Sequence, residues 1–140
     1  MASLREYGRT AGAVHSISMH LVWCPKYRRP VLEGRVAHRL ASLIETKCAE
    51  RGWMVQALEI MPDHVQLSVR TGPDASPALV AHQCKGFTSR VLRAEFPHLR
   101  SRLPTLWSKS YLVTSVGHVS AATIGRYIAE QTTRPEKGRP

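Results

Sequence analysis

The chain has 140 residues, with 20 lysines and arginines against 10 aspartates and glutamates, so its formal net charge at pH 7 is +10. Its length is typical of a single domain, its hydrophobic content of 43% argues against wholesale disorder, and it has no apolar run long enough to form a transmembrane helix. So large a basic excess in so small a domain favours a polyanionic partner, most often nucleic acid.

In chain order, residues 1–13 are small and polar and predict a flexible arm. Residues 14–24 alternate between apolar and polar side chains, which predicts a strand. Residues 33–51 carry apolar side chains at helical spacing, and Gly52 would end that helix. The expected buried face of the helix consists of Val36, Leu40, Leu43, Ile44 and Cys48.

Two strands should follow. Residues 53–61 are mostly apolar and predict a short buried strand, and residues 62–63 predict a turn. Residues 64–70 alternate again, which places the three apolar side chains on one face of the strand and the four polar ones on the other. The apolar set is Val65, Leu67 and Val69, and the polar set is His64, Gln66, Ser68 and Arg70.

A second helix should begin after Ser76, a good cap, and run to about Phe96. Its expected buried stripe consists of Val80, Cys84, Phe87 and Val91. A basic connection over residues 97–107 leads to a strand within 108–116. Ser120 would cap a last helix that ends near residue 131, and residues 132–140 predict a basic flexible tail.

This β-α-β-β-α-β order, followed by a last helix, predicts an α+β fold: a ferredoxin-like or RRM-like sandwich with one antiparallel sheet. Helices would cover one face of the sheet. The other face would carry the polar side chains of residues 64–70, and an open, polar and basic face of this kind suits nucleic acid.

The sequence lacks the motifs of several common enzyme classes. The sequence contains no P-loop, no G-x-S-x-G, no H-E-x-x-H and no G-x-G-x-x-G. The three cysteines, Cys24, Cys48 and Cys84, form no C-x-x-C pair, which argues against a disulfide scaffold and against a cysteine zinc site. We expect them to be reduced core residues of an intracellular protein.

His64 and Gln66 stand two residues apart on a predicted strand, so both side chains leave the same face. Each could donate one atom to a single metal ion. Taken alone, this pair is more typical of polar residues on a solvated sheet face.

Tyr127 and Gln131 stand four residues apart on the predicted last helix and therefore share a face. Taken alone, the tyrosine suits the core side of an amphipathic helix. However, Gly125 is unfavourable in the middle of a helix, and the stripe ends in a glutamine, which is a poor core residue but a usable oxygen ligand. A tyrosine can also attack a phosphodiester, beside a divalent ion that polarises the phosphate.

Four motifs in fixed order carry a family resemblance. They are residues 20–32 (HLVWCPKYRRPVL), residues 61–67 (MPDHVQL), residues 106–111 (LWSKSY) and the pair Tyr127 and Gln131. Together they resemble the TnpA-type, single-tyrosine transposases of the HUH superfamily, which move insertion sequences as single-stranded DNA. The resemblance covers about residues 14–131.

The resemblance implies a mechanism and a site. Family members hold Mg²⁺ or Mn²⁺ with two histidines of a His-hydrophobic-His strand and one helix glutamine. The matching positions here are His64, Gln66 and Gln131, and the nucleophile position is Tyr127. Attack at the end of the element would leave a 5′-phosphotyrosine and a free 3′-OH, which later joins the strands.

The resemblance also implies partners and a location. Family members recognise subterminal DNA hairpins and act as homodimers in which the tyrosine helix can complete the partner's site, and Gly117 lies where such a helix would need a hinge. We expect a cytoplasmic, nucleoid-associated prokaryotic protein without a membrane partner. From charge and location alone, six residues are candidate phosphate contacts, although each also suits a solvated basic face: Lys26, Arg28, Arg29, Lys85, Arg90 and Arg93.

One position departs from the family pattern, because Gln66 stands where the second histidine is usual. Its amide oxygen suits a hard cation such as Mg²⁺, but a lost imidazole would weaken or change metal binding. A weakened or domesticated module that binds single-stranded DNA or RNA without cutting it is therefore the alternative. An RNA-recognition surface would show aromatic side chains on the open face, where residues 64–70 have none. Binding to a membrane surface would need a strongly hydrophobic and basic helix, which the sequence lacks.

Overall fold

The computed structural model describes residues 8–10, 13–115 and 121–131. The expected hinge at Gly117, the cap at Ser120 and the tail at 132–140 lie outside these residues. The elements in chain order are β1 (Gly8–Thr10), β2 (Ala13–His15), β3 (Ile17–Trp23), the short 3₁₀ turn η2 (Lys26–Arg28), α1 (Gly34–Glu50), β4 (Met54–Met61), β5 (His64–Thr71), α2 (Pro77–Glu95), α3 (Pro97–Ser101), β6 (Leu112–Ser115) and α4 (Ala121–Glu130).

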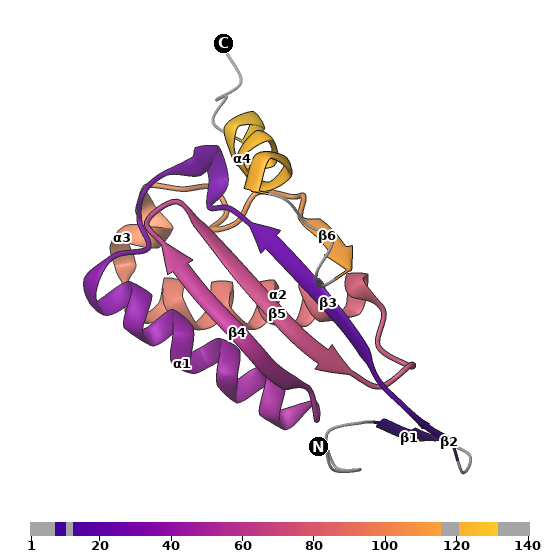
Figure 1. Ribbon diagram of the computed structural model, residues 1–140. Helices are drawn as coiled ribbons and strands as arrows, with labels where there is room; N and C mark the ends of the chain where they lie inside the picture. Colours follow the sequence, from indigo (N-terminus) through magenta and orange to yellow (C-terminus); the bar gives the residue numbers. More distant parts are fainter. Residues whose placement is uncertain (1–7, 11–12, 116–120, 132–140) are drawn as a thin grey trace.

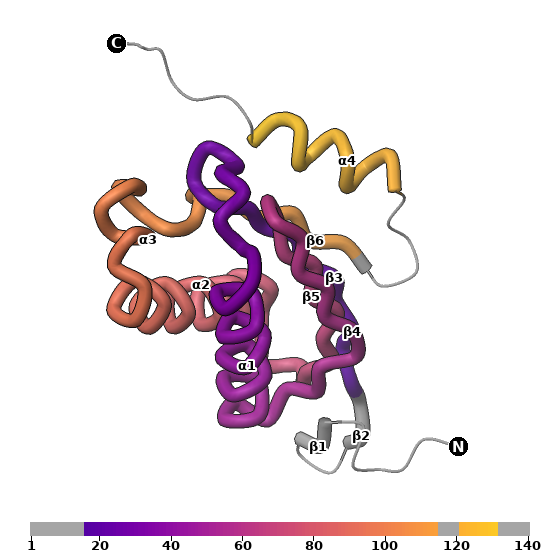
Figure 2. Tube along the Cα trace, turned by 90° about the vertical axis from the view of Figure 1, so that its left-hand side faces the viewer, coloured from indigo at the N-terminus to yellow at the C-terminus, as the bar shows by residue number. Residues whose placement is uncertain are grey.

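The main sheet has the strand order β4-β5-β3-β6, and every neighbouring pair is antiparallel. Helices α1 and α2 cover one face of this sheet, and α4 lies on the opposite side, at the end where β3 and β4 finish and β5 begins (Figures 1 and 2). This arrangement confirms the predicted ferredoxin-like α+β sandwich with an added C-terminal helix.

The core lies between the sheet and the two helices, where the predicted patterns of β5 and α1 are both confirmed. Strand β5 alternates strictly, with Val65, Leu67 and Val69 fully buried and the residues between them half-buried. Helix α1 buries all five of its predicted apolar residues, and Gly52 follows it with a positive φ of 77°, a conformation that glycine adopts without strain. The three cysteines are free and buried, as predicted.

Strand β4 is exposed along much of its length, so the prediction of a buried strand at 53–61 is wrong. The strand lies at the edge of the sheet, with β5 as its neighbour. A bulge between Val55 and Ala57 also shifts its register. Because the bulge adds one residue, Val55, Leu58 and Ile60 all pack against the core although they break simple alternation.

Helix α2 begins as expected, because Ser76 Oγ accepts a hydrogen bond from the backbone N–H of Leu79 at 3.1 Å. Its buried stripe differs from the prediction: Phe87 and Val91 are only half-buried, and Thr88 and Leu92 are buried instead. The polar Thr88 is tolerated there because its hydroxyl donates to the carbonyl of Cys84 and accepts from Trp107 Nε1.

The strand predicted within residues 108–116 is confirmed as β6, whereas the strand predicted at residues 14–24 differs in extent. Residues 14–24 do not form one strand, because β2 pairs with β1 in a separate two-stranded ribbon while β3 joins the main sheet. Strand β1 lies within the segment expected as an arm. Strand β6 is confined to residues 112–115, and residues 108–110 before it form a loop. Within the described ranges, no helix combines the length and apolarity needed to cross a membrane.

Candidate active site

His64 and Gln66 project from the start of β5 on the face that points away from α1 and α2. Both side chains are half-buried, and Nε2 of Gln66 lies 3.3 Å from Nε2 of His64. The pairing expected from their spacing is therefore a direct contact in the structure.

Asp63, in the turn between β4 and β5, orients the His64 ring. Its Oδ1 lies 2.8 Å from Nδ1 of His64, while its Oδ2 lies 3.1 Å from Nε of Arg28. A carboxylate accepts hydrogen bonds, so the ring proton belongs on Nδ1 and the lone pair on Nε2. A carboxylate behind the imidazole is the usual support of a metal-binding histidine.

Tyr127 and Gln131 lie on the side of α4 that faces the loop at residues 108–110. Nε2 of Gln131 donates to the backbone carbonyl of Tyr127 at 3.3 Å, which leaves its Oε1 to accept from Ser110 Oγ at 3.2 Å. Ser110 Oγ also lies 2.9 Å from Tyr127 Oη. Because the hydroxyl proton of Ser110 points to Gln131, Tyr127 is the donor in that bond.

The position of the Tyr127 phenol keeps it protonated. Burial raises its pKa above the usual value of 10.0, and the hydrogen bond with Ser110 offsets part of this effect. At neutral pH the oxygen therefore carries its proton, and attack on a phosphate requires that proton to leave.

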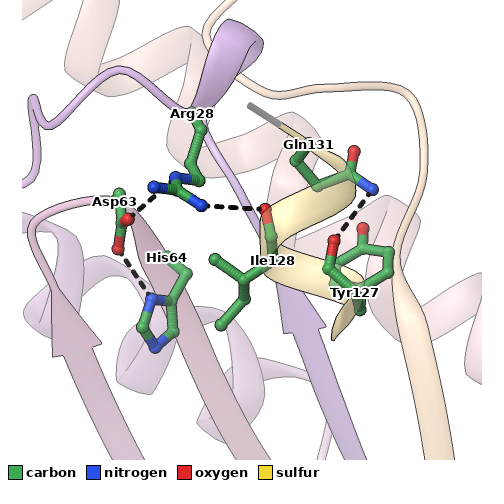
Figure 3. Close-up of polar contacts among 6 residues, drawn as sticks. All are labelled: Arg28, Asp63, His64, Tyr127, Ile128 and Gln131. Atoms are coloured by element: carbon green, nitrogen blue, oxygen red, sulfur yellow. Dashed lines mark hydrogen bonds and ion pairs between the residues drawn. The ribbon is translucent and has the colours of Figure 1, made fainter. Parts of the chain in front are cut away.

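The structure brings together His64 with Gln66 and Tyr127 with Gln131, but it does not join the two pairs. The side chain of Ile128 lies between His64 and Tyr127 (Figure 3). No residue of α4 is fully buried, so this helix docks on the sheet through partial contacts. A joint site would require α4 to move, or the α4 of another protomer.

His64 and Gln66 offer neutral donor atoms to a divalent metal ion. Within residues 8–10, 13–115 and 121–131 there is no group of three or more His, Cys, Asp and Glu side chains placed to hold a metal. Nε2 of His64 carries a lone pair and lies against the amide nitrogen of Gln66. A metal ion there would replace this contact and meet the amide oxygen of Gln66, which is a good ligand for a hard cation. These residues fit a metal bound by neutral donors and completed by further oxygens.

Three of the predicted DNA contacts lie at or near the protein surface. Lys26 Nζ lies 5.4 Å from the ring centroid of Tyr27, and exposed Arg90 lies 5.5 Å from the centroid of Phe87. Exposed Arg29 lines a pocket of about 430 Å³ together with residues 30–31 and 102–103. These side chains remain candidates for phosphate contacts.

The other three bind atoms of the protein itself. Lys85 Nζ donates to the carbonyls of Ser108 and Ser110 at 2.9 and 3.0 Å. Arg93 donates to the carbonyls of residues 103 and 104, and Arg28 contacts Asp63 and the carbonyl of residue 128. Their surroundings give each of them a structural partner.

Ser110 was given no role by sequence reasoning, yet it contacts both Tyr127 and Gln131. The signal available was its place in the LWSKSY motif at residues 106–111. A pocket of about 250 Å³ opens beside this contact, lined by residues 26–27, 108–110 and 130–131. Its charged lining consists of two lysines, Lys26 and Lys109, and one carboxylate, Glu130.

Known proteins resemble this chain in sequence. The family model described as "Transposase IS200 like" matches residues 13–131. The chain is 34% identical to the ISDra2 transposase TnpA of Deinococcus radiodurans over 128 residues, which cover 90% of this chain and 91% of that protein. It is 26% identical to the transposase for insertion sequence element IS200 of Salmonella typhimurium, over 85% of this chain and 79% of that protein.

Solved structures resemble the fold as well. A crystal structure of a candidate transposase from Deinococcus radiodurans superposes with a TM-score of 0.83 at 32% identity, covering 91% of this chain and 99% of that one. A REP-associated tyrosine transposase solved bound to a REP hairpin superposes with a TM-score of 0.55 at 12% identity, covering 79% of this chain and 61% of that one.

Proposed function

Because the chain belongs to the family of IS200-like transposases, we propose that it cleaves and rejoins single-stranded DNA at the ends of an insertion sequence, with Tyr127 as the nucleophile. One observation carries this proposal. His64 on β5 and the pair on α4, Tyr127 and Gln131, lie at the same end of the sheet although they are far apart in the sequence (Figure 3). Gln66 belongs to the same group, because its side chain contacts His64.

In the proposed site, Nε2 of His64 and the amide oxygens of Gln66 and Gln131 would hold Mg²⁺ or Mn²⁺, and the bound ion would polarise the scissile phosphate and stabilise its developing charge. Gln66 must turn its amide to take this role, because its nitrogen faces Nε2 of His64 in the structure. Asp63 keeps the His64 ring in the tautomer that presents Nε2. Gln131 must release Ser110 to take this role, because Ser110 occupies its oxygen in the structure.

The protein's own chemistry centres on Tyr127. Its Oη loses a proton and forms a bond to phosphorus, while the bond from phosphorus to the 3′ oxygen breaks. The released oxygen takes up a proton, which leaves a free 3′-OH and a 5′-phosphotyrosine. In the joining step, a 3′-OH attacks a second phosphotyrosine, and the tyrosine leaves with its oxygen protonated.

We also propose that the protein recognises subterminal hairpins and acts as a homodimer. The net charge of +10 and a fold relative solved with a REP hairpin support hairpin binding. The partial docking of α4, with Ile128 between Tyr127 and His64, supports a site completed by the α4 of a second protomer. Mixing Tyr127→Phe with His64→Ala protein would restore some activity if sites are shared between protomers, and none if each site is built within one chain.

The covalent intermediate provides the direct test. Purified protein is mixed with labelled single-stranded DNA that carries the end of the element and its hairpin, with Mg²⁺, Mn²⁺ or a chelator, and adducts are resolved on a denaturing gel. We expect a metal-dependent adduct that Tyr127→Phe abolishes. Tyr111→Phe, at a half-buried tyrosine outside the proposed site, is the matched control and should retain the adduct.

The departure at Gln66 gives the same experiment a second outcome. Tight hairpin binding without an adduct under either metal would contradict the proposed chemistry and leave the alternative, a module that binds DNA without cutting it. In that case Gln66→His is the variant that tests whether the missing imidazole is the cause. Absence of binding to the correct DNA end would contradict the proposed substrate.

A further inference from the structure

Arg28 connects its own turn, η2, to two segments that are distant in the sequence: the turn at Asp63 and helix α4. Its Nε contacts Oδ2 of Asp63 at 3.1 Å, and its Nη1 donates to the backbone carbonyl of Ile128 in α4 at 3.4 Å (Figure 3). The same Asp63 holds Nδ1 of His64 at 2.8 Å through its other oxygen. One guanidinium thus contacts both the helix that carries Tyr127 and the carboxylate that orients His64.

The backbone at this point is unusual. Tyr27 and Arg28 have φ values of 61° and 53°, and neither is glycine. Residues other than glycine rarely adopt this left-handed backbone conformation. Two such residues in a row persist only where surrounding contacts hold them. The contacts to Asp63 and Ile128 supply such support, and the turn in return aims the guanidinium at both.

We propose that Arg28 is a positioning residue with two roles, rather than a phosphate contact: it holds the end of α4 through the Ile128 carbonyl, and it orients His64 through Asp63. This inference rests on the proposed function, in which His64 is a metal ligand and Tyr127 the nucleophile. With α4 docked, Arg28 fixes the Asp63 carboxylate, and that carboxylate fixes the His64 ring. When α4 leaves, the guanidinium loses its helix partner but keeps Asp63.

The planar guanidinium is necessary for this role. It presents several N–H donors in a rigid fork and can serve a carboxylate and a carbonyl at once. It also places positive charge at the C-terminal end of α4, where the helix dipole favours a cation. Arg28 meets its two acceptors with two different nitrogens, Nε and Nη1. A lysine has only one nitrogen, so we expect it to keep the ion pair with Asp63 and to lose the longer contact to the Ile128 carbonyl.

This difference defines two variants. Arg28→Gln removes the charge that fixes Asp63, so we expect Mn²⁺ affinity to fall by about threefold to tenfold, less than the 10–100-fold typical of a residue that contacts the ligand directly. Arg28→Lys should keep Mn²⁺ affinity within about twofold. In both variants the amides of residues 121–131 should exchange hydrogen faster, because both lose the contact to Ile128.

The measurements use the full chain without DNA: calorimetric titration with Mn²⁺, hydrogen exchange by mass spectrometry, and ¹⁵N NMR of the His64 ring. The NMR readout reports the Nδ1–H tautomer without metal, so it separates failure of this inference from failure of the proposed metal site. Arg29→Gln, which removes the same charge at the neighbouring exposed residue, is the control for these DNA-free readouts.

A split between the two Arg28 variants, in which both speed exchange in α4 but only Arg28→Gln lowers Mn²⁺ affinity, supports the two roles. An Arg28→Gln variant that matches Arg29→Gln in Mn²⁺ affinity, His64 tautomer and exchange would overturn them, and a loss of DNA binding alone would return Arg28 to the phosphate contacts. Equal effects of Arg28→Gln and Arg28→Lys on all three readouts, together with lower stability in urea, would also overturn them by reducing Arg28 to a structural support. If the wild type binds no Mn²⁺, the proposed metal site fails, and the tautomer and exchange data alone decide the two positioning roles of Arg28.

Discussion

Replacing Lys85 with methionine should destabilise the protein and loosen the loop that supports Tyr127. The ammonium of Lys85 donates to the carbonyls of Ser108 and Ser110 at 2.9 and 3.0 Å. Through this clamp it fixes the loop from which the Ser110 hydroxyl contacts both Tyr127 and Gln131. Methionine has a similar length and shape but donates no hydrogen bond.

The magnitude follows from these two contacts. A hydrogen bond to a charged group contributes about 1.5–3 kcal/mol to stability. Burial lowers the pKa of the Lys85 ammonium, which shows that part of the gain is offset by lost hydration, and solvent screens the part that remains exposed. The carbonyl of Ser110 can also regain water in the variant. We therefore expect Lys85→Met to lower the free energy of unfolding by about 2 kcal/mol.

Urea unfolding followed by tryptophan fluorescence measures this loss. The matched control is Lys109→Met, because Lys109 lies in the same loop but is exposed, and its stability should stay within about 0.5 kcal/mol of the wild type. If Lys85→Met is as stable as Lys109→Met, the clamp contributes nothing and this reasoning is wrong. If it is equally stable but binds DNA poorly, Lys85 is the phosphate contact that its charge suggested.

Three further predictions concern the core and the helix caps. Burial, with a contribution from the Asp63 charge, raises the pKa of the Cys24 thiol from 9.0 to about 12; the folded state therefore keeps a proton that the unfolded chain loses above pH 9, and stability should fall with rising pH. Between pH 8 and pH 10, the free energy of unfolding of the wild type should fall by about 1.4 kcal/mol more than that of Cys24→Ala, as measured by urea unfolding. Equal falls in the two proteins would refute the raised pKa of Cys24. Thr88→Val should cost about 1–3 kcal/mol, because it leaves the buried Nε1–H of Trp107 without its acceptor; a thermal or urea midpoint like that of the wild type would argue against that hydrogen bond. Ser76→Ala should cost about 1 kcal/mol by removing the cap of α2, whereas Ser76→Asp, measured in the same way, should retain stability.

The buried faces of β5 and α1 were predicted correctly because the period of each element depends on local geometry. The alternation of β5 and the helical spacing of α1 each place their apolar residues on a single face, and the structure buries those residues. Strand β4 was misjudged for two reasons that its apolar content does not reveal: its place at the sheet edge and the bulge after Val55. Both depend on its pairing with β5.

Charged and polar residues show the same limit more sharply. The composition indicates a basic protein, but Arg28, Lys85 and Arg93 bind carbonyl groups or a carboxylate of the protein itself. Ser110 is unremarkable in the sequence until the fold places it against Tyr127. A side chain of this kind is defined by its partner, and the partner comes from another part of the chain.

The family, the fold class and the candidate chemical groups follow from motifs and periodicities that neighbouring residues encode. The geometry of the site does not, because its contacts join residues as far apart as Arg28 and Ile128. That α4 docks with Ile128 between His64 and Tyr127 follows from how the helix packs on the folded sheet. Local sequence specifies which faces are apolar, whereas the packing of distant elements decides which polar atoms meet.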